Sequence, residues 1–166
     1  MPDVSREHLS QYRLEQSVEC FKASQKLLDS QLYKDSINRS YYATFHAIRS
    51  VLALSAVDFK RHKDVIGYFN REYVKTEIFP RELGKRIGEI QRIREKSDYS
   101  DFFIAPKEEA ERQLETACNV IESVSHFLRC QYLDKGIDDM ERGNTLPLEE
   151  AFEKITELRN SRRNAE

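Results

Sequence analysis

Apolar side chains recur every three or four residues along most of this chain, and that spacing predicts helices that each bury one face. The clearest stretch runs from about Tyr33 to Ala56. There, successive helical turns place apolar or aromatic residues on one stripe, made of Ile37, Tyr41, Phe45, Ile48 and Leu52. We expect this helix to be the central element around which the others pack.

The same spacing predicts five further helices. Residues 6–30 form the first, and the short break after it should fold the central helix back antiparallel. A shorter helix begins near His62, another has Pro80 in its first turn, a long regular one is expected to end at Gly136, and a last one starts at Pro147. The positions expected to face the core are Leu14, Val18, Phe21 and Leu28; Val65, Ile66, Phe69, Tyr73 and Val74; Leu83, Ile87, Ile90 and Ile93; and Ala110, Leu114, Ala117, Ile121, Val124, Leu128 and Tyr132.

Composition favours the same fold class. The 166 residues include only five Gly and four Pro, and long runs are rich in the strong helix formers Glu, Lys, Arg, Leu, Ala and Gln. A chain of this length buries one core rather than two. We therefore predict an all-α, antiparallel up-and-down helical bundle over residues 1–135 and an acidic tail with a short helix over residues 136–166.

Several classes of protein do not fit. Cys20, Cys118 and Cys130 have neither a pairing pattern nor metal-ligand spacing, which favours reduced thiols and a cytoplasmic location. No apolar run approaches the ~18 residues of a membrane span. The four histidines are scattered and no Gly-rich phosphate loop is present, so we expect no metal, no other cofactor and no membrane partner.

The net charge of −2 conceals two regions of opposite sign. Residues 60–96 contain eleven Lys or Arg and six Asp or Glu, whereas residues 101–160 contain seven and fourteen. This division indicates a basic surface for a polyanion or an acidic partner. Helix faces that are merely solvated and unevenly charged would give the same count.

Polar candidates flank the apolar stripe of the central helix. Arg39 lies one turn before Tyr42, His46 lies one turn after it, and Arg39 and His46 are seven residues apart on a similar side. Further along, Arg94 and Asp98 have the four-residue spacing of an ion pair. The alternative is structural: a histidine among aromatic residues is often a hydrogen-bonded core residue.

A basic connector precedes the helix that begins near His62. Its residues Lys60, Arg61, His62 and Lys63 meet the N-terminus of that helix, where unpaired backbone N–H groups favour an anion such as phosphate. A solvated helix cap is the alternative interpretation.

Three segments together carry a resemblance to a known family. The segments are Tyr41-Tyr42-Ala43-Thr44-Phe45-His46, Lys60-Arg61-His62-Lys63-Asp64-Val65 and Arg94-Glu95-Lys96-Ser97-Asp98-Tyr99. In this order they resemble the HEPN family, in particular its small prokaryotic branch. The resemblance implies a helical bundle that forms a homodimer and binds nucleotides or RNA, with a minimal nucleotidyltransferase or an antitoxin as partner in a toxin–antitoxin module.

Ribonucleases of that family carry an Arg, four to six residues and then a His, usually on the helix that here ends at Tyr99. No His follows Arg94 within that distance, and Asp98 stands there instead. Arg39 and His46 meet the spacing on the central helix. Three hypotheses therefore remain: a nucleotide- or RNA-binding module that uses these groups together with Tyr42, the basic connector and Arg94; a metal-independent endoribonuclease with His46 as base and Arg39 as phosphate clamp; and a purely structural interaction bundle.

Overall fold

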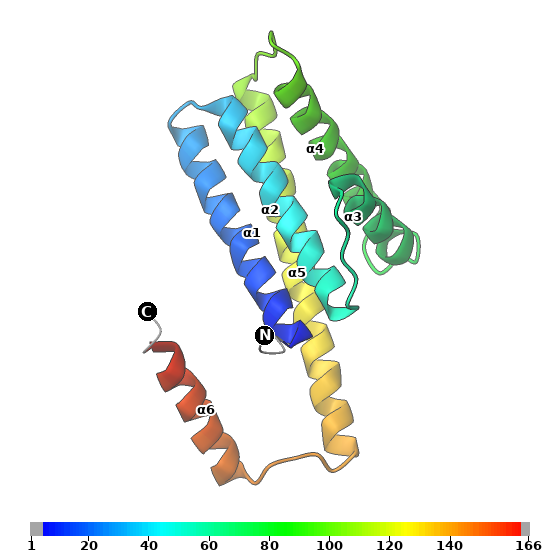
Figure 1. Cartoon of the computed structure of the whole chain (residues 1–166), viewed down its shortest axis with the longest axis vertical. Helices are drawn as coiled ribbons and strands as arrows, with labels where there is room; N and C mark the ends of the chain where they lie inside the picture. The colour runs from blue at the N-terminus through cyan, green and yellow to red at the C-terminus, as the bar shows by residue number, and fades with distance from the viewer. Residues whose placement is uncertain (1–4, 164–166) are drawn as a thin grey trace. The chain divides into compact units, whose positions relative to one another are not determined.

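The structure, a computed structural model, describes residues 5–163 and the side chains of residues 5–161 (Figure 1). The described part contains helices and no strands, which confirms the all-α fold class. The helices are α1 (Arg6–Asp29), α2 (Tyr33–Leu54), α3 (His62–Phe69), a π-helical turn η1 (Asn70–Val74), α4 (Arg81–Tyr99), α5 (Lys107–Glu141) and α6 (Leu148–Arg163). Contacts divide the chain into two units, Met1–Leu128 and Arg129–Glu166.

Helix α2 is the centre of the first unit, as the sequence predicts. In Figure 1 it lies between α1 and α4, and α5 runs behind it. Its residues Ile37, Ile48, Val51 and Leu52 are fully buried, and most of them belong to one apolar core with side chains from α3, η1, α4 and α5. At ~25 cal/mol per Å² of apolar surface removed from water, this core is the main stabilising term of the unit.

The packing of α1 differs from the prediction. Its buried residues are Ser10, Arg13, Ser17 and Ser24, whereas the predicted apolar stripe of Leu14, Val18, Phe21 and Leu28 is only half-buried. Small side chains let two helix backbones approach closely, and the Ser17 hydroxyl donates to the Ala43 carbonyl across the contact at 2.6 Å. The Ser24 hydroxyl lies 2.7 Å from that of Ser40. Ser17 and Ser24 satisfy their hydroxyl groups on α2, so these small residues occupy the contact between the two helices, here called the seam, and the larger apolar residues flank it.

The segment from α3 to α4 follows the prediction closely. α3 begins at His62, and the five residues expected to face inward from α3 and η1 are all buried. Helix α4 begins at Arg81, directly after Pro80, and buries Leu83, Ile87 and Ile90, whereas Ile93 is half-buried. Gly84 lets α4 lie close to η1, since a Cβ there would stand 2.8 Å from Val74 Cγ1.

Gly136 does not end the long helix, which was a wrong prediction. Helix α5 continues through it to Glu141, and a turn follows in which Gly143 has φ +73°. A glycine inside a helix costs only ~1 kcal/mol relative to alanine, so the favourable neighbours on both sides carry the helix past it.

The second unit exposes its apolar residues, among them Tyr132, the last position of the stripe predicted on the long helix, which is 40 % exposed. The predicted short helix is present as α6, and its Leu148, Phe152 and Ile155 are 73 %, 61 % and 47 % exposed. Among the described residues, no helix has both the length and the apolar character that crossing a membrane requires.

Candidate functional site

Side chains from three helices meet on one side of α2. Tyr41, Tyr42, Phe45 and His46 come from α2 itself, and His62 turns toward them from the start of α3. The Tyr41 hydroxyl lies 3.1 Å from His62 Nδ1. The His62 ring centroid is 4.1 Å from that of Phe45, and the rings of Tyr42 and His46 are 6.3 Å apart. We call these five residues the histidine cluster.

Arg94 brings α4 to the same place. Its guanidinium carbon lies 5.2 Å from the Tyr41 ring centroid and 5.8 Å from that of Tyr42, so cation–π attraction holds the side chain against both rings. Arg94 also forms an ion pair with Asp98 at 2.9 Å. Its buried Nε has no hydrogen-bond partner in the described part of the chain. The three segments quoted from the sequence therefore converge in space.

Arg39 and His46 both lie near the Tyr42 ring. The Arg39 guanidinium is exposed and stands 5.8 Å from the centroid of that ring. It also interacts with the Cys20 thiol of α1. The two groups of the predicted pair are therefore both neighbours of Tyr42.

The sequence analysis missed an ion-pair network beside His46. Both Arg13 of α1 and Arg49 of α2 place an Nη2 atom 2.7 Å from Asp58 Oδ2, and Arg13 also donates to the Arg49 carbonyl. Two spacings could have indicated it. Arg49 follows His46 by three residues on one helix face, and Arg13 shares its face with the seam residue Ser17.

These surroundings keep the imidazoles neutral near pH 7. Burial, followed by the positive charge of Arg49, lowers the pKa of His46 below its ordinary value of 6.5. Burial, followed by the charge of Arg94, lowers the pKa of His62 in the same direction. Burial raises the pKa of Tyr41 to about 12, so its hydroxyl stays protonated. The cluster therefore offers neutral groups that can each donate or accept a proton.

Positive charge exceeds negative charge around the cluster. Two guanidinium groups share the single Asp58 carboxylate, and Arg94 has one carboxylate in Asp98. The exposed Arg39 has no ion pair with a described acidic residue. Four guanidinium groups thus lie around the cluster with two ion-paired carboxylates, and Glu95 adds a third negative charge near Tyr41.

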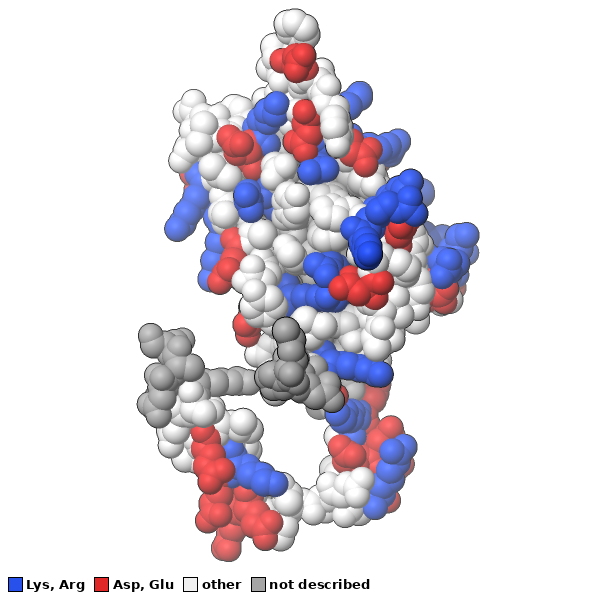
Figure 2. Space-filling view, in the orientation of Figure 1, with Lys and Arg blue, Asp and Glu red and all other residues white. Residues whose placement is uncertain are grey.

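The rest of the basic connector lies outside the cluster. Lys60, Arg61 and Lys63 are exposed, Arg61 pairs with Asp64 at 2.8 Å, and Lys63 lines a groove further along α3. Figure 2 shows basic side chains along the side of the bundle formed by α3 and α4, with acidic ones interspersed. The predicted phosphate-binding residues therefore form a broader surface than one pocket.

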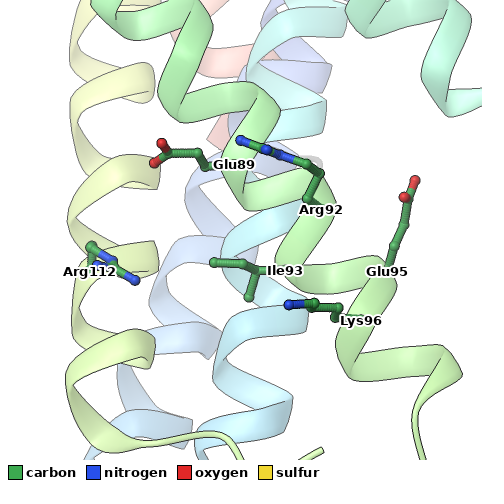
Figure 3. Close-up of a pocket in the computed structure, with 6 residues that line it drawn as sticks. All are labelled: Glu89, Arg92, Ile93, Glu95, Lys96 and Arg112. Atoms are coloured by element: carbon green, nitrogen blue, oxygen red, sulfur yellow. The ribbon is translucent and has the colours of Figure 1, made fainter.

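A separate groove of about 600 Å³ lies between α4 and α5. In Figure 3, Ile93 and Lys96 of α4 face Arg112 of α5, and Glu95 points away. Arg92 and Lys96 of this groove each lie two residues from Arg94, so they point about 200° away from it around α4, and no residue of the histidine cluster lines the groove. The groove and the histidine cluster are therefore different surfaces.

Comparison with known proteins identifies the family. The sequence model of the HEPN domain matches residues 10–127, a stretch that includes the whole histidine cluster. The chain belongs to the HEPN family. Within this HEPN domain, the polar groups of the cluster come from α2, α3 and α4, and no histidine follows Arg94 on α4.

Relatives of this HEPN protein include chains that have been named after a toxin function. A protein named "putative toxin" from Methanocaldococcus jannaschii is 28 % identical over 126 residues, which cover 76 % of this chain and 86 % of the relative. A UPF0332 protein from Thermotoga maritima is 28 % identical over 137 residues, covering 82 % and 97 %. A second "putative toxin" from M. jannaschii is 30 % identical over 87 residues, covering 52 % and 65 %.

Proposed function

We propose that this HEPN protein binds the phosphates of a nucleotide or RNA at the histidine cluster, as part of a toxin–antitoxin or nucleotidyltransferase-linked module. The observation that carries the proposal is the excess of guanidinium groups over carboxylates around two imidazoles of lowered pKa. Guanidinium groups bind phosphate oxygens through paired N–H donors, and the half-buried ring of Tyr42 offers an aromatic surface for a base. Relatives that are named "putative toxin" support the link to a toxin module.

Arg39 is the most suitable residue for a test of binding. Its side chain is exposed and has no described acidic partner, so Arg39→Gln removes charge without breaking an ion pair. We expect weaker binding of a fluorescent single-stranded RNA in anisotropy titrations, and a salt dependence of log K reduced by about 0.7, the value for one phosphate contact on a single strand. Arg92→Gln, on the opposite face of α4, is the matched control. Equal effects of the two variants, or no RNA binding by the wild type, would contradict the proposal.

A metal-independent endoribonuclease is the second candidate, and the lowered pKa of His46 favours it. A neutral imidazole can take the proton of a 2′-hydroxyl group, while Arg39 would stabilise charge on the phosphate. Incubation of mixed RNA in EDTA separates the two candidates. Cleavage that is lost in His46→Ala and kept in His8→Ala, a substitution of an exposed residue of α1, supports the enzyme. RNA that stays intact while it binds supports the binding module.

The homodimer and the nucleotidyltransferase or antitoxin partner stay predictions. A structural interaction bundle would show neither RNA cleavage nor salt-sensitive RNA binding, so the same two experiments test that third hypothesis.

A further inference from the structure

A second groove runs along the outer side of α3. Its volume is about 430 Å³, and it is lined by Phe59, Lys63, Asp64, Gly67, Tyr68 and Arg71. We propose that this groove, here called the α3 groove, binds an unpaired nucleobase, so that the protein selects single-stranded over double-stranded RNA. The inference rests on the proposed function, because it gives the RNA a second point of contact beside the histidine cluster.

Two aromatic rings form the apolar part of the α3 groove. The ring centroids of Phe59 and Tyr68 are 5.3 Å apart, and the two planes are inclined by 47°. Both rings are half-buried against the core of the bundle, so packing fixes them while part of each stays open to solvent. Every nucleobase has a π-face, and stacking on fixed aromatic rings is a sequence-tolerant way to bind single strands.

Gly67 leaves room beside these rings. It lies in the middle of α3, and a Cβ built there would meet no atom within 4 Å. The groove is therefore open where any other residue would place a side chain. A flat ring can enter such a space without a rearrangement of the helix.

The charged groups of the α3 groove suit a nucleotide. The Arg71 guanidinium lies over the Tyr68 ring, with its carbon 5.2 Å from the ring centroid, and pairs with Glu72, so a base in the groove meets this guanidinium as well as the rings. Lys63 is exposed and forms no ion pair with the described residues, so its ammonium group is available to a phosphate. Asp64 is held by Arg61 at 2.8 Å, which offsets its negative charge.

The α3 groove and the histidine cluster contain consecutive residues of the chain. His62 belongs to the cluster and Lys63 lines the groove, and consecutive Cα atoms are about 3.8 Å apart. Their side chains point about 100° apart around α3, so an RNA strand with a phosphate at the cluster would pass around the start of α3 to place a base in the groove. A duplex keeps its bases stacked and paired, and its bases cannot enter the groove.

Tyr68 is the residue that tests stacking. Tyr68→Leu keeps an apolar side chain against the core and removes the ring, and Tyr68→Phe keeps the ring. In anisotropy titrations of a fluorescent 12-nucleotide single-stranded RNA, we expect Tyr68→Leu to weaken binding by about 5- to 150-fold, the range for loss of one stacking ring. Tyr68→Phe should bind within about threefold of the wild type. An abasic ribose-phosphate strand of the same length should not distinguish Tyr68→Leu from the wild type.

Gly67 supplies an independent test with a matched control. Gly67→Glu places a carboxylate in the groove, whereas Gly88→Glu adds the same charge to α4 at a position that also has open space. We expect Gly67→Glu to weaken single-stranded RNA binding at least tenfold and Gly88→Glu to change it less than twofold. Circular dichroism confirms that both variants stay folded.

The possible failures can be told apart. If Arg39→Gln weakens binding while Tyr68→Leu and Gly67→Glu do not, the α3 groove inference is overturned and the proposed function stands. Wild-type binding of duplex RNA as tight as that of single-stranded RNA also overturns the inference alone. If the wild type binds no RNA, both are overturned.

Discussion

Replacing Gly84 or Gly88 with alanine should have opposite effects, although both glycines lie on α4 one turn apart. At either position, alanine gains about 1 kcal/mol of helix propensity. At Gly84 the added methyl group would stand 2.8 Å from Val74 Cγ1 and 3.1 Å from Asn70 Oδ1, whereas at Gly88 it would meet nothing within 4 Å. Val74 is β-branched and buried, so it cannot simply turn away, and overpacking of this kind costs about 1–3 kcal/mol.

We therefore expect Gly88→Ala to raise the free energy of unfolding by about 1 kcal/mol. Gly84→Ala should change it by between zero and about −2 kcal/mol, the sum of the propensity gain and the overpacking cost. Guanidinium chloride denaturation followed by far-UV circular dichroism measures both values. Val74→Ala supplies the control, because without the Val74 methyl groups Gly84→Ala should become stabilising, with a coupling energy of about 1–3 kcal/mol. Equal stabilisation by the two alanines in the wild-type background would refute the reasoning.

Three further predictions concern the effect of single substitutions on the stability of the bundle. Because the pKa of His46 is lowered, the unfolded chain binds a proton at higher pH than the folded chain, so the free energy of unfolding decreases as pH falls below about 6.5. His46→Gln should make this decrease between pH 7 and 5 shallower in denaturation curves. An unchanged pH dependence would count against the lowered pKa of His46. Asp58→Asn leaves the buried Arg13 without its carboxylate and should cost about 1–3 kcal/mol in the same assay, against less than about 1 kcal/mol for Asp64→Asn, whose partner is exposed. Ser17→Leu should overpack the seam between α1 and α2 and lower the unfolding midpoint, and a stabilised variant would show that the seam is not closely packed.

Local patterns in the sequence were sufficient for most helices. The three- and four-residue spacing on α2 identified its buried stripe, since an apolar face of that width has to be covered. The start of α3 at His62 and of α4 after Pro80 also followed from local signals. The end of α5 did not, because one glycine is a small cost beside the propensity of its neighbours.

The residues of α1 that are buried against α2 could not be predicted from the pattern of α1 alone. Judged alone, α1 has a more apolar stripe at Leu14 and Val18 than at Ser17 and Ser24. The serines are nevertheless the buried residues, because hydroxyl groups on α1 find acceptors on α2 and their small size permits close contact. The stabilisation therefore comes from contacts between the two helices, which the pattern of α1 alone does not show.

The sequence by itself determined the all-α fold, the central position of α2 and the segments that carry polar chemistry, because each depends on residues close together in the chain. Only the tertiary structure decided that His62 bonds to Tyr41, that Arg94 lies against the same ring and that Arg13 and Arg49 share Asp58. These contacts join different segments of the chain, and burial in this packing, followed by the charges of the neighbouring arginines, lowers the pKa of both histidines. Helical spacing fixes which residues share a face, whereas packing of the helices fixes which faces meet.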